Sequence, residues 1–248
     1  MKKYLMVIAN YPDQRQDFFK TYFSPRNKEY CKIHGYEYLE YLGPYNPFRD
    51  HPTWWKFTIV RDLLNDGTLK EGDTLTHIDA DMCIHKLNLE YPTHKSFTYC
   101  IDSGNTHCMG NYSIKVNDWT KNMFDLLLDD HRYENLKDKI TLHEYFGHSD
   151  SFWSIFREQA SWYSLAGIKR HSDIPFYNLA HYGWHSDRDE WTVYSLEELY
   201  EHVDVLPTCW NVTEMPGESG CVFNINPVEK KDVVIRHFAG GQPWRNDY

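Results

Sequence analysis

The stretch Thr74-Leu-Thr-His-Ile-Asp79-Ala-Asp81-Met-Cys-Ile84 is typical of a buried β-strand that runs into two closely spaced carboxylates. Two acids at the end of an apolar strand cannot both face a core without compensation. In open α/β sheets this end of a strand is also where ligands bind. Acidic oxygens there suit a hard divalent cation, Mg²⁺ or Mn²⁺, which would bridge the protein to a phosphate group. The competing interpretation is a solvated turn with two ordinary acids.

The chain has 248 residues, and neither a repeat nor a low-complexity linker divides it. We therefore expect one α/β domain over residues 1–248. Lysine and arginine total 26 against 36 aspartate and glutamate residues, which gives a formal net charge of -10. This balance argues against a broad nucleic-acid or anionic-membrane surface. A bound metal ion would reverse the sign locally, so a phosphorylated ligand is still compatible with the charge.

Strand and helix signals alternate along the chain. The apolar run over residues 4–9 is typical of a strand buried on both faces in a parallel sheet. Ser24 as an N-cap and Gly35 as a stop signal predict a helix between them. Another helix, with an apolar face, is expected from His51 to Gly67. Further strands are expected over residues 36–41, 96–101, 109–116 and 233–238, and further helices from residue 118, over 149–160 and over 196–203.

The cysteines and the N-terminal residues indicate in which cellular compartment the protein is found. None of the six cysteines shows Cys-x-x-Cys spacing, so neither a zinc knuckle nor a redox motif is indicated. No signal peptide or long apolar segment is evident. We therefore expect a soluble, cytoplasmic protein without a transmembrane anchor and with free thiols.

Single residues elsewhere are candidates for substrate contacts. Asn10 and Tyr11 follow the first strand, where they could hold a nucleotide base or form a plain turn. Lys56 could reach a phosphate or be an ordinary solvated helix cation. Asp150 stands near an expected helix start, where a carboxylate is also favourable for the helix dipole alone.

Some of the histidines are candidate metal ligands. His143 and His148 superficially resemble a zinc-protease signature, but they are five residues apart with a glycine between them, so they do not share one helical face. His237 differs, because it ends an apolar run and is followed by Gly240 and Gly241, which permit close approach of a ligand. With the two acids of residues 79–81, this imidazole would complete a three-ligand metal site.

Several motifs together resemble a GT-A glycosyltransferase of the galactosyl/xylosyltransferase group, glycosyltransferase family 34, and are similar to the glycogenin-like family 8. They occur in family order over nearly the whole chain. The motifs are Asn27-Lys-Glu-Tyr30-Cys-Lys-Ile-His34-Gly35-Tyr36, His51-Pro52-Thr-Trp54-Trp55-Lys56, Asp79-Ala80-Asp81, Leu206-Pro207 with Trp210-Asn211, and His237-x-x-Gly240 with Pro243-Trp244.

The resemblance implies a single GT-A domain, with a central mainly parallel sheet flanked by helices. It implies Mn²⁺ or Mg²⁺ held by Asp79, Asp81 and His237, a nucleoside-diphosphate sugar donor, and a sugar or glycan acceptor. The donor-binding residues that it implies are Asn10, Tyr11, Lys56, Asp79, Ala80, Gly240 and Trp244.

Three departures from the family pattern stand out. No membrane anchor is evident, unlike in the eukaryotic Golgi members, which fits a soluble enzyme of bacterial or viral type. Gln242 replaces the expected phosphate-binding lysine, so either Arg236, Lys56 or Arg245 takes that role or donor binding differs. The Asp-Gln pair usual at the acceptor helix is Asp150-Ser151 here.

The related families retain the anomeric configuration of the transferred sugar, so the resemblance favours retention. An inverting enzyme would instead need a carboxylate base, for which Asp150 and Asp102 are the candidates. One alternative is a haloacid dehalogenase-like phosphatase that uses Asp79 and Asp81. Another is a non-catalytic, aromatic-rich sugar-binding module. A transferase acting on DNA bases would share the chemistry, but the net charge counts against it.

Overall fold

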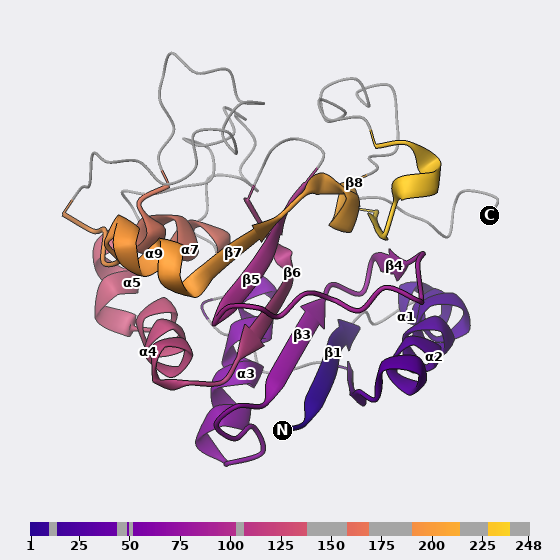
Figure 1. Ribbon diagram of the computed structural model, residues 1–248. Helices are drawn as coiled ribbons and strands as arrows, with labels where there is room; N and C mark the ends of the chain where they lie inside the picture. Colours follow the sequence, from indigo (N-terminus) through magenta and orange to yellow (C-terminus); the bar gives the residue numbers. More distant parts are fainter. Residues whose placement is uncertain are drawn as a thin grey trace.

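A six-stranded sheet forms the centre of the protein. The computed structural model describes residues 1–9, 14–43, 49, 52–102, 107–137, 158–168, 190–213 and 228–238, and all structural statements concern these ranges. The strand order is β2-β1-β3-β6-β5-β7, and Figure 1 labels each of these strands except β2. The strands are β1 (Lys3–Ala9), β2 (Glu37–Leu42), β3 (Thr74–Ile78), β5 (Phe97–Ile101), β6 (His107–Lys115) and β7 (Val203–Leu206). The β1–β2, β1–β3 and β5–β7 pairs are parallel, and β6 runs antiparallel to both of its neighbours. The expected α/β fold with a mainly parallel sheet is therefore confirmed.

A second, three-stranded sheet changes the interpretation of the acidic stretch. Its order is β4-β9-β8, with β4 at Met82–Ile84, β9 at Ile235–His237 and β8 at Val212–Thr213. The sequence predicted a strand that runs into Asp79 and Asp81, and β3 does end at Ile78, directly before them. The sequence did not predict that the chain then enters the small sheet at Met82. A backbone hydrogen bond of 3.0 Å from Met82 N to Asp79 O closes the turn between them. The two acids thus lie where the two sheets meet.

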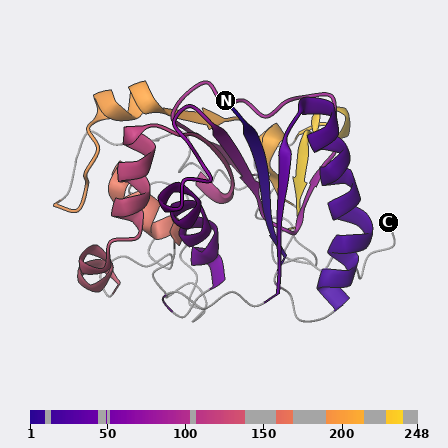
Figure 2. The same ribbon diagram turned by 90° about the horizontal axis from the view of Figure 1, so that it is seen from below.

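Helices cover both faces of the central sheet (Figure 2). On one face lie α3 (Trp55–Asn65), α4 (Asp118–Leu127) and α7 (Glu158–Ala166), and on the other lies the helical segment that ends with α2 (Ser24–His34). Strand β1 contributes Tyr4 and Met6 to the first apolar core and Leu5 and Val7 to the second. This alternation confirms that β1 is buried on both faces.

Local capping rules hold at some helix ends and fail at others. Gly35 ends α2 in the left-handed conformation, with a φ of 72°, as predicted. Ser24 is not an N-cap, because α1 (Gln14–Phe18) and a π-helical turn (Phe19–Phe23) run into α2 with helical backbone angles. Helix α4 is capped by Asn117, whose side chain accepts a hydrogen bond from Thr120 N.

The remaining elements are short. They are α5 (Asp130–Leu136), α9 (Leu196–His202) and 3-10 turns at Pro52–Trp54, Thr208–Trp210 and Lys230–Asp232. Of the helix expected over residues 149–160, only the part from Glu158 onward lies in the described ranges. Among the described residues, no helix combines the length and the apolar character needed to cross a membrane. The five described cysteines are free thiols, and Cys221 lies outside the described residues.

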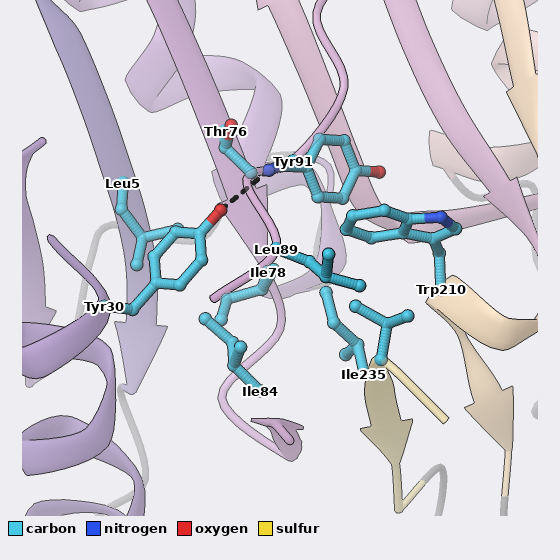
Figure 3. A pocket seen from close by; sticks show the side chains of 10 residues that line it. Leu5, Tyr30, Thr76, Ile78, Ile84, Leu89, Tyr91, Trp210 and Ile235 are labelled. Carbon is cyan, nitrogen blue, oxygen red and sulfur yellow. Dashed lines mark hydrogen bonds between the residues drawn. The ribbon is translucent and has the colours of Figure 1, made fainter. Parts of the chain in front are cut away.

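A small void lies between the two sheets (Figure 3). Its volume is about 10 Å³, and apolar side chains such as Ile78, Trp210 and Ile235 line it. Tyr30 closes one side, and its hydroxyl accepts a hydrogen bond of 2.7 Å from Tyr91 N. A void of this size holds about one water molecule at most. It is therefore a packing defect between the sheets rather than a substrate site.

Candidate metal centre

The three predicted metal ligands lie together at the junction of the two sheets. Asp79 follows β3, Asp81 precedes β4, and His237 ends β9. Each offers a ligand atom, and these atoms all lie within 4.8 Å of one another. The pairing of β4 with β9 sets Met82 opposite His237, and Phe238 N donates a hydrogen bond of 3.0 Å to Asp81 O. The small sheet therefore brings a histidine more than 150 residues away in sequence to the acidic turn.

Asp79 is held by two cationic or polar neighbours. Lys56 Nζ lies 3.0 Å from Oδ1 and 3.2 Å from Oδ2, and His77 Nε2–H donates to Oδ1 at 2.9 Å. Burial opposes ionisation of this carboxyl, but the charge of Lys56 and the hydrogen bond from His77 outweigh it. Together they lower the pKa of Asp79 well below its usual range. Asp79 is therefore ionised and fixed in direction at neutral pH.

Gly110 on β6 makes room for the Asp79 carboxylate. A Cβ atom at this position would lie 2.4 Å from Asp79 Oδ2, far inside normal contact distance. Gly110 O also accepts a hydrogen bond of 2.8 Å from Asp79 N. We did not single out this residue from the sequence, although a glycine inside a strand is a known sign of close approach by another group.

Lys56 is buried, with 6% of its surface exposed, so the interpretation as a solvated helix cation is wrong. Its Nζ also lies 3.5 Å from Glu158 Oε1. Burial by itself would lower the pKa of Lys56, but attraction to Asp79 and to Glu158 outweighs it and raises the pKa above its ordinary value. Lys56 thus links the acidic turn to the start of α7. Its expected contact with a phosphate remains a prediction.

Glu158 is a second residue that the sequence did not reveal. It is buried, and its Oε2 atom has no hydrogen-bond partner within the described part of the chain. A lone glutamate in a helical stretch gives no local signal of such a position. Its importance follows from its contact with Lys56, which lies on another helix, α3.

Asp81 differs from Asp79 in its surroundings. Its side chain is 23% exposed, and its Oδ1 atom is buried with no hydrogen-bond partner in the described ranges. Oδ1 lies 3.6 Å from His237 Nε2. Burial, with repulsion from Asp79, raises the pKa of Asp81 against the attraction of His237. An orphaned acidic oxygen beside an imidazole and a second carboxylate fits a divalent cation such as Mn²⁺ or Mg²⁺.

Of the other predicted residues, the structure describes Ala80 and Asp102. Ala80 is buried between the two acids. Asp102 follows β5, and its charge contributes to the raised pKa of Cys108 and of Tyr163. Five predicted residues, and the alternative phosphate ligand Arg245 together with Gln242, lie outside the described residues; the five are Asn10, Tyr11, Asp150, Gly240 and Trp244.

Arg236, another candidate phosphate ligand, precedes His237 on β9. Because side chains alternate along a strand, the two residues face opposite sides of the small sheet. Arg236 lines a separate pocket of about 210 Å³ together with His85 and Lys230. The structure therefore does not bring Arg236 to the acid–histidine cluster.

Comparison with known proteins gives information on the fold, through a solved structure. No protein-family model matches the sequence, and no curated protein does either. The structure is similar to that of a glycosyltransferase involved in the glycosylation of the major capsid of PBCV-1. The match covers 99% of this chain and 96% of that chain, with a TM-score of 0.52 and 12% sequence identity. In the part that the structure describes, the chain therefore shares the fold of that glycosyltransferase.

A second match is partial. It is to the catalytic domain of Drosophila β1,4-galactosyltransferase 7 in complex with xylobiose, and it covers 51% of this chain and 52% of that chain. The TM-score is 0.32 and the sequence identity is 16%, so no argument rests on it.

Proposed function

We propose that the protein is a metal-dependent glycosyltransferase that moves a sugar from a nucleoside-diphosphate sugar to a sugar or glycan acceptor. The observation that carries the proposal is the cluster of Asp79, Asp81 and His237 at a sheet junction, in a chain with the fold of a glycosyltransferase. The resemblance of its motifs to families 34 and 8 supports the same reaction class.

The residues of the cluster fit Mn²⁺ or Mg²⁺. Two carboxylates and one imidazole supply three ligand atoms, and the unpartnered oxygen of Asp81 provides a reason for a cation there. When bound, the cation would stabilise the negative charge that builds on the departing diphosphate. Lys56 keeps Asp79 ionised and correctly directed for this role.

The acceptor side of the reaction rests on the sequence resemblance. We infer retention of anomeric configuration, with the acceptor hydroxyl held on the face of the sugar from which the diphosphate departs, so that the departing phosphate accepts the hydroxyl proton. If the enzyme inverts, Asp102 and Asp150 are the candidate bases. Asn10 and Tyr11 are proposed to contact the base of the donor, and Gly240 and Trp244 to contact its other parts.

A screen of nucleoside-diphosphate sugars, with and without Mn²⁺, tests the proposal. Thermal unfolding and the release of free diphosphate are followed together. A donor at 100 times its Kd should stabilise the protein by about 2.7 kcal/mol. For a chain of this size that corresponds to a rise in Tm of about 5–10 °C.

The control is the same screen with EDTA in place of the metal, which should remove both responses. Hydrolysis of simple phosphate esters without response to any donor would contradict the proposal in favour of a phosphatase. Glycan binding without donor turnover would favour the sugar-binding module instead.

A further inference from the structure

The two ring nitrogens of His237 face different groups. Nδ1 lies 3.1 Å from Asn211 Oδ1, while Nε2 lies 3.6 Å from Asp81 Oδ1. Both His237 and Asn211 are buried, and Asn211 is fully so. One nitrogen therefore meets an amide inside the protein, and the other meets the acidic cluster.

The amide oxygen decides which nitrogen carries the proton. With its oxygen toward the ring, the Asn211 amide only accepts hydrogen bonds, and Nδ1 is then the donor to Asn211 Oδ1. In a neutral imidazole, Nε2 then carries the lone pair, and it points toward Asp81. The opposite amide orientation would present N–H groups to Nδ1 and place the proton on Nε2. A cation would then find no lone pair at that nitrogen.

The backbone around Asn211 is fixed to the strands that carry the site. Asn211 N donates a hydrogen bond of 2.8 Å to Thr208 O within the 3-10 turn. The side chain of Asn111, on β6, donates a hydrogen bond of 2.7 Å to Trp210 O. Directly after Asn211, strand β8 pairs in parallel with β9. The amide is therefore held in register with His237 rather than placed on a free loop.

We propose that Asn211 is a positioning residue that fixes the His237 imidazole with its proton on Nδ1, which directs the Nε2 lone pair toward a bound cation. The inference rests on the proposed function, because it assumes that a divalent cation occupies the cluster. Partners of this kind behind a ligating histidine set both ring orientation and basicity.

Binding of Mn²⁺ alone, without donor or acceptor, tests the inference. Affinity is measured by calorimetry or by the paramagnetic resonance signal of free Mn²⁺. Asn211→Leu should weaken binding about 10–100-fold, since the acceptor for Nδ1–H is lost. Asn211→Asp keeps an acceptor oxygen and should retain the affinity to within about tenfold. Asn111→Leu, which removes an equally buried amide that donates to the same turn from β6, is the comparison variant and should lose less affinity than Asn211→Leu, because the acceptor for Nδ1–H remains.

Equal Mn²⁺ affinity in Asn211→Leu and wild type would overturn the inference, and so would equal losses in Asn211→Leu and Asn111→Leu. If Asn211→Leu does not fold, nitrogen NMR of His237 in the Mg²⁺-bound wild type decides. A proton on Nδ1 supports the inference, and one on Nε2 overturns it. Wild-type Mn²⁺ binding without turnover of any donor would refute the proposed function while these tests of Asn211 remain valid.

Discussion

Replacing Gly110 by alanine would drive a methyl group into the carboxylate of Asp79. The new Cβ would lie 2.4 Å from Asp79 Oδ2 and 3.0 Å from Met82 Cε. Since carbon and oxygen atoms in ordinary contact are separated by about 3.4 Å or more, the carboxylate must retreat by about 1 Å. That movement disturbs the contacts of Asp79 with Lys56, at 3.0 and 3.2 Å, and with His77, at 2.9 Å.

The expected cost of this change has two parts. Overpacking of a filled site should lower the free energy of unfolding by about 1–3 kcal/mol. A shift of about 1 Å in a group that positions the reacting atoms should lower turnover about 100-fold. Urea unfolding measures the first part, and donor turnover at saturating Mn²⁺ measures the second.

Gly67→Ala is the matched control. Gly67 has a φ of 76°, and a Cβ there would meet no atom within 4 Å. Alanine at this position should cost about 1–2 kcal/mol through backbone strain alone. The control should therefore lose stability but keep full turnover. Equal turnover in both variants would refute the argument that Gly110 sets the position of Asp79.

Three further predictions concern charge and stability. Lys56→Met leaves the carboxylates of Asp79 and Glu158 without their buried cation. The free energy of unfolding in urea should therefore fall by about 3–5 kcal/mol, and by less at low pH, where the carboxylates become protonated. An unchanged urea midpoint would contradict this. Burial lowers the pKa of His107 to about 4, so the unfolded state binds more protons between pH 6.5 and 4. Stability should fall by up to about 3 kcal/mol as pH drops through that window, and unfolding of His107→Phe should lack this loss. Asp81→Asn removes a carboxylate that burial disfavours, so the metal-free protein should gain about 0.5–2 kcal/mol in thermal unfolding while losing stabilisation by Mn²⁺.

The acidic turn could be predicted because its residues conflict with their local setting. Asp79 and Asp81 directly follow an apolar strand, and His237 ends another apolar run, so each stands where a core residue would otherwise be expected. The switch between two sheets at Met82 could not be predicted. It depends on the pairing of β4 with β9, a contact between segments far apart in the sequence.

Other positions show why local rules were insufficient. Ser24 has the residue type of an N-cap, but burial of Phe19 and Phe23 favours a continuous helical segment through that position. Glu158 and Gly110 gain their importance from groups on other elements, Lys56 in one case and Asp79 in the other. Such contacts leave no periodic pattern in the sequence.

Asp81→Ala provides the most direct test of the central claim. Turnover of the responsive nucleoside-diphosphate sugar is measured with and without Mn²⁺, in wild type and variant, after circular dichroism has shown that both are folded. The account predicts metal-dependent turnover in the wild type and its loss in the variant, because the unpartnered Asp81 oxygen is the proposed metal ligand. Unchanged metal-dependent turnover in a well-folded Asp81→Ala protein would contradict it.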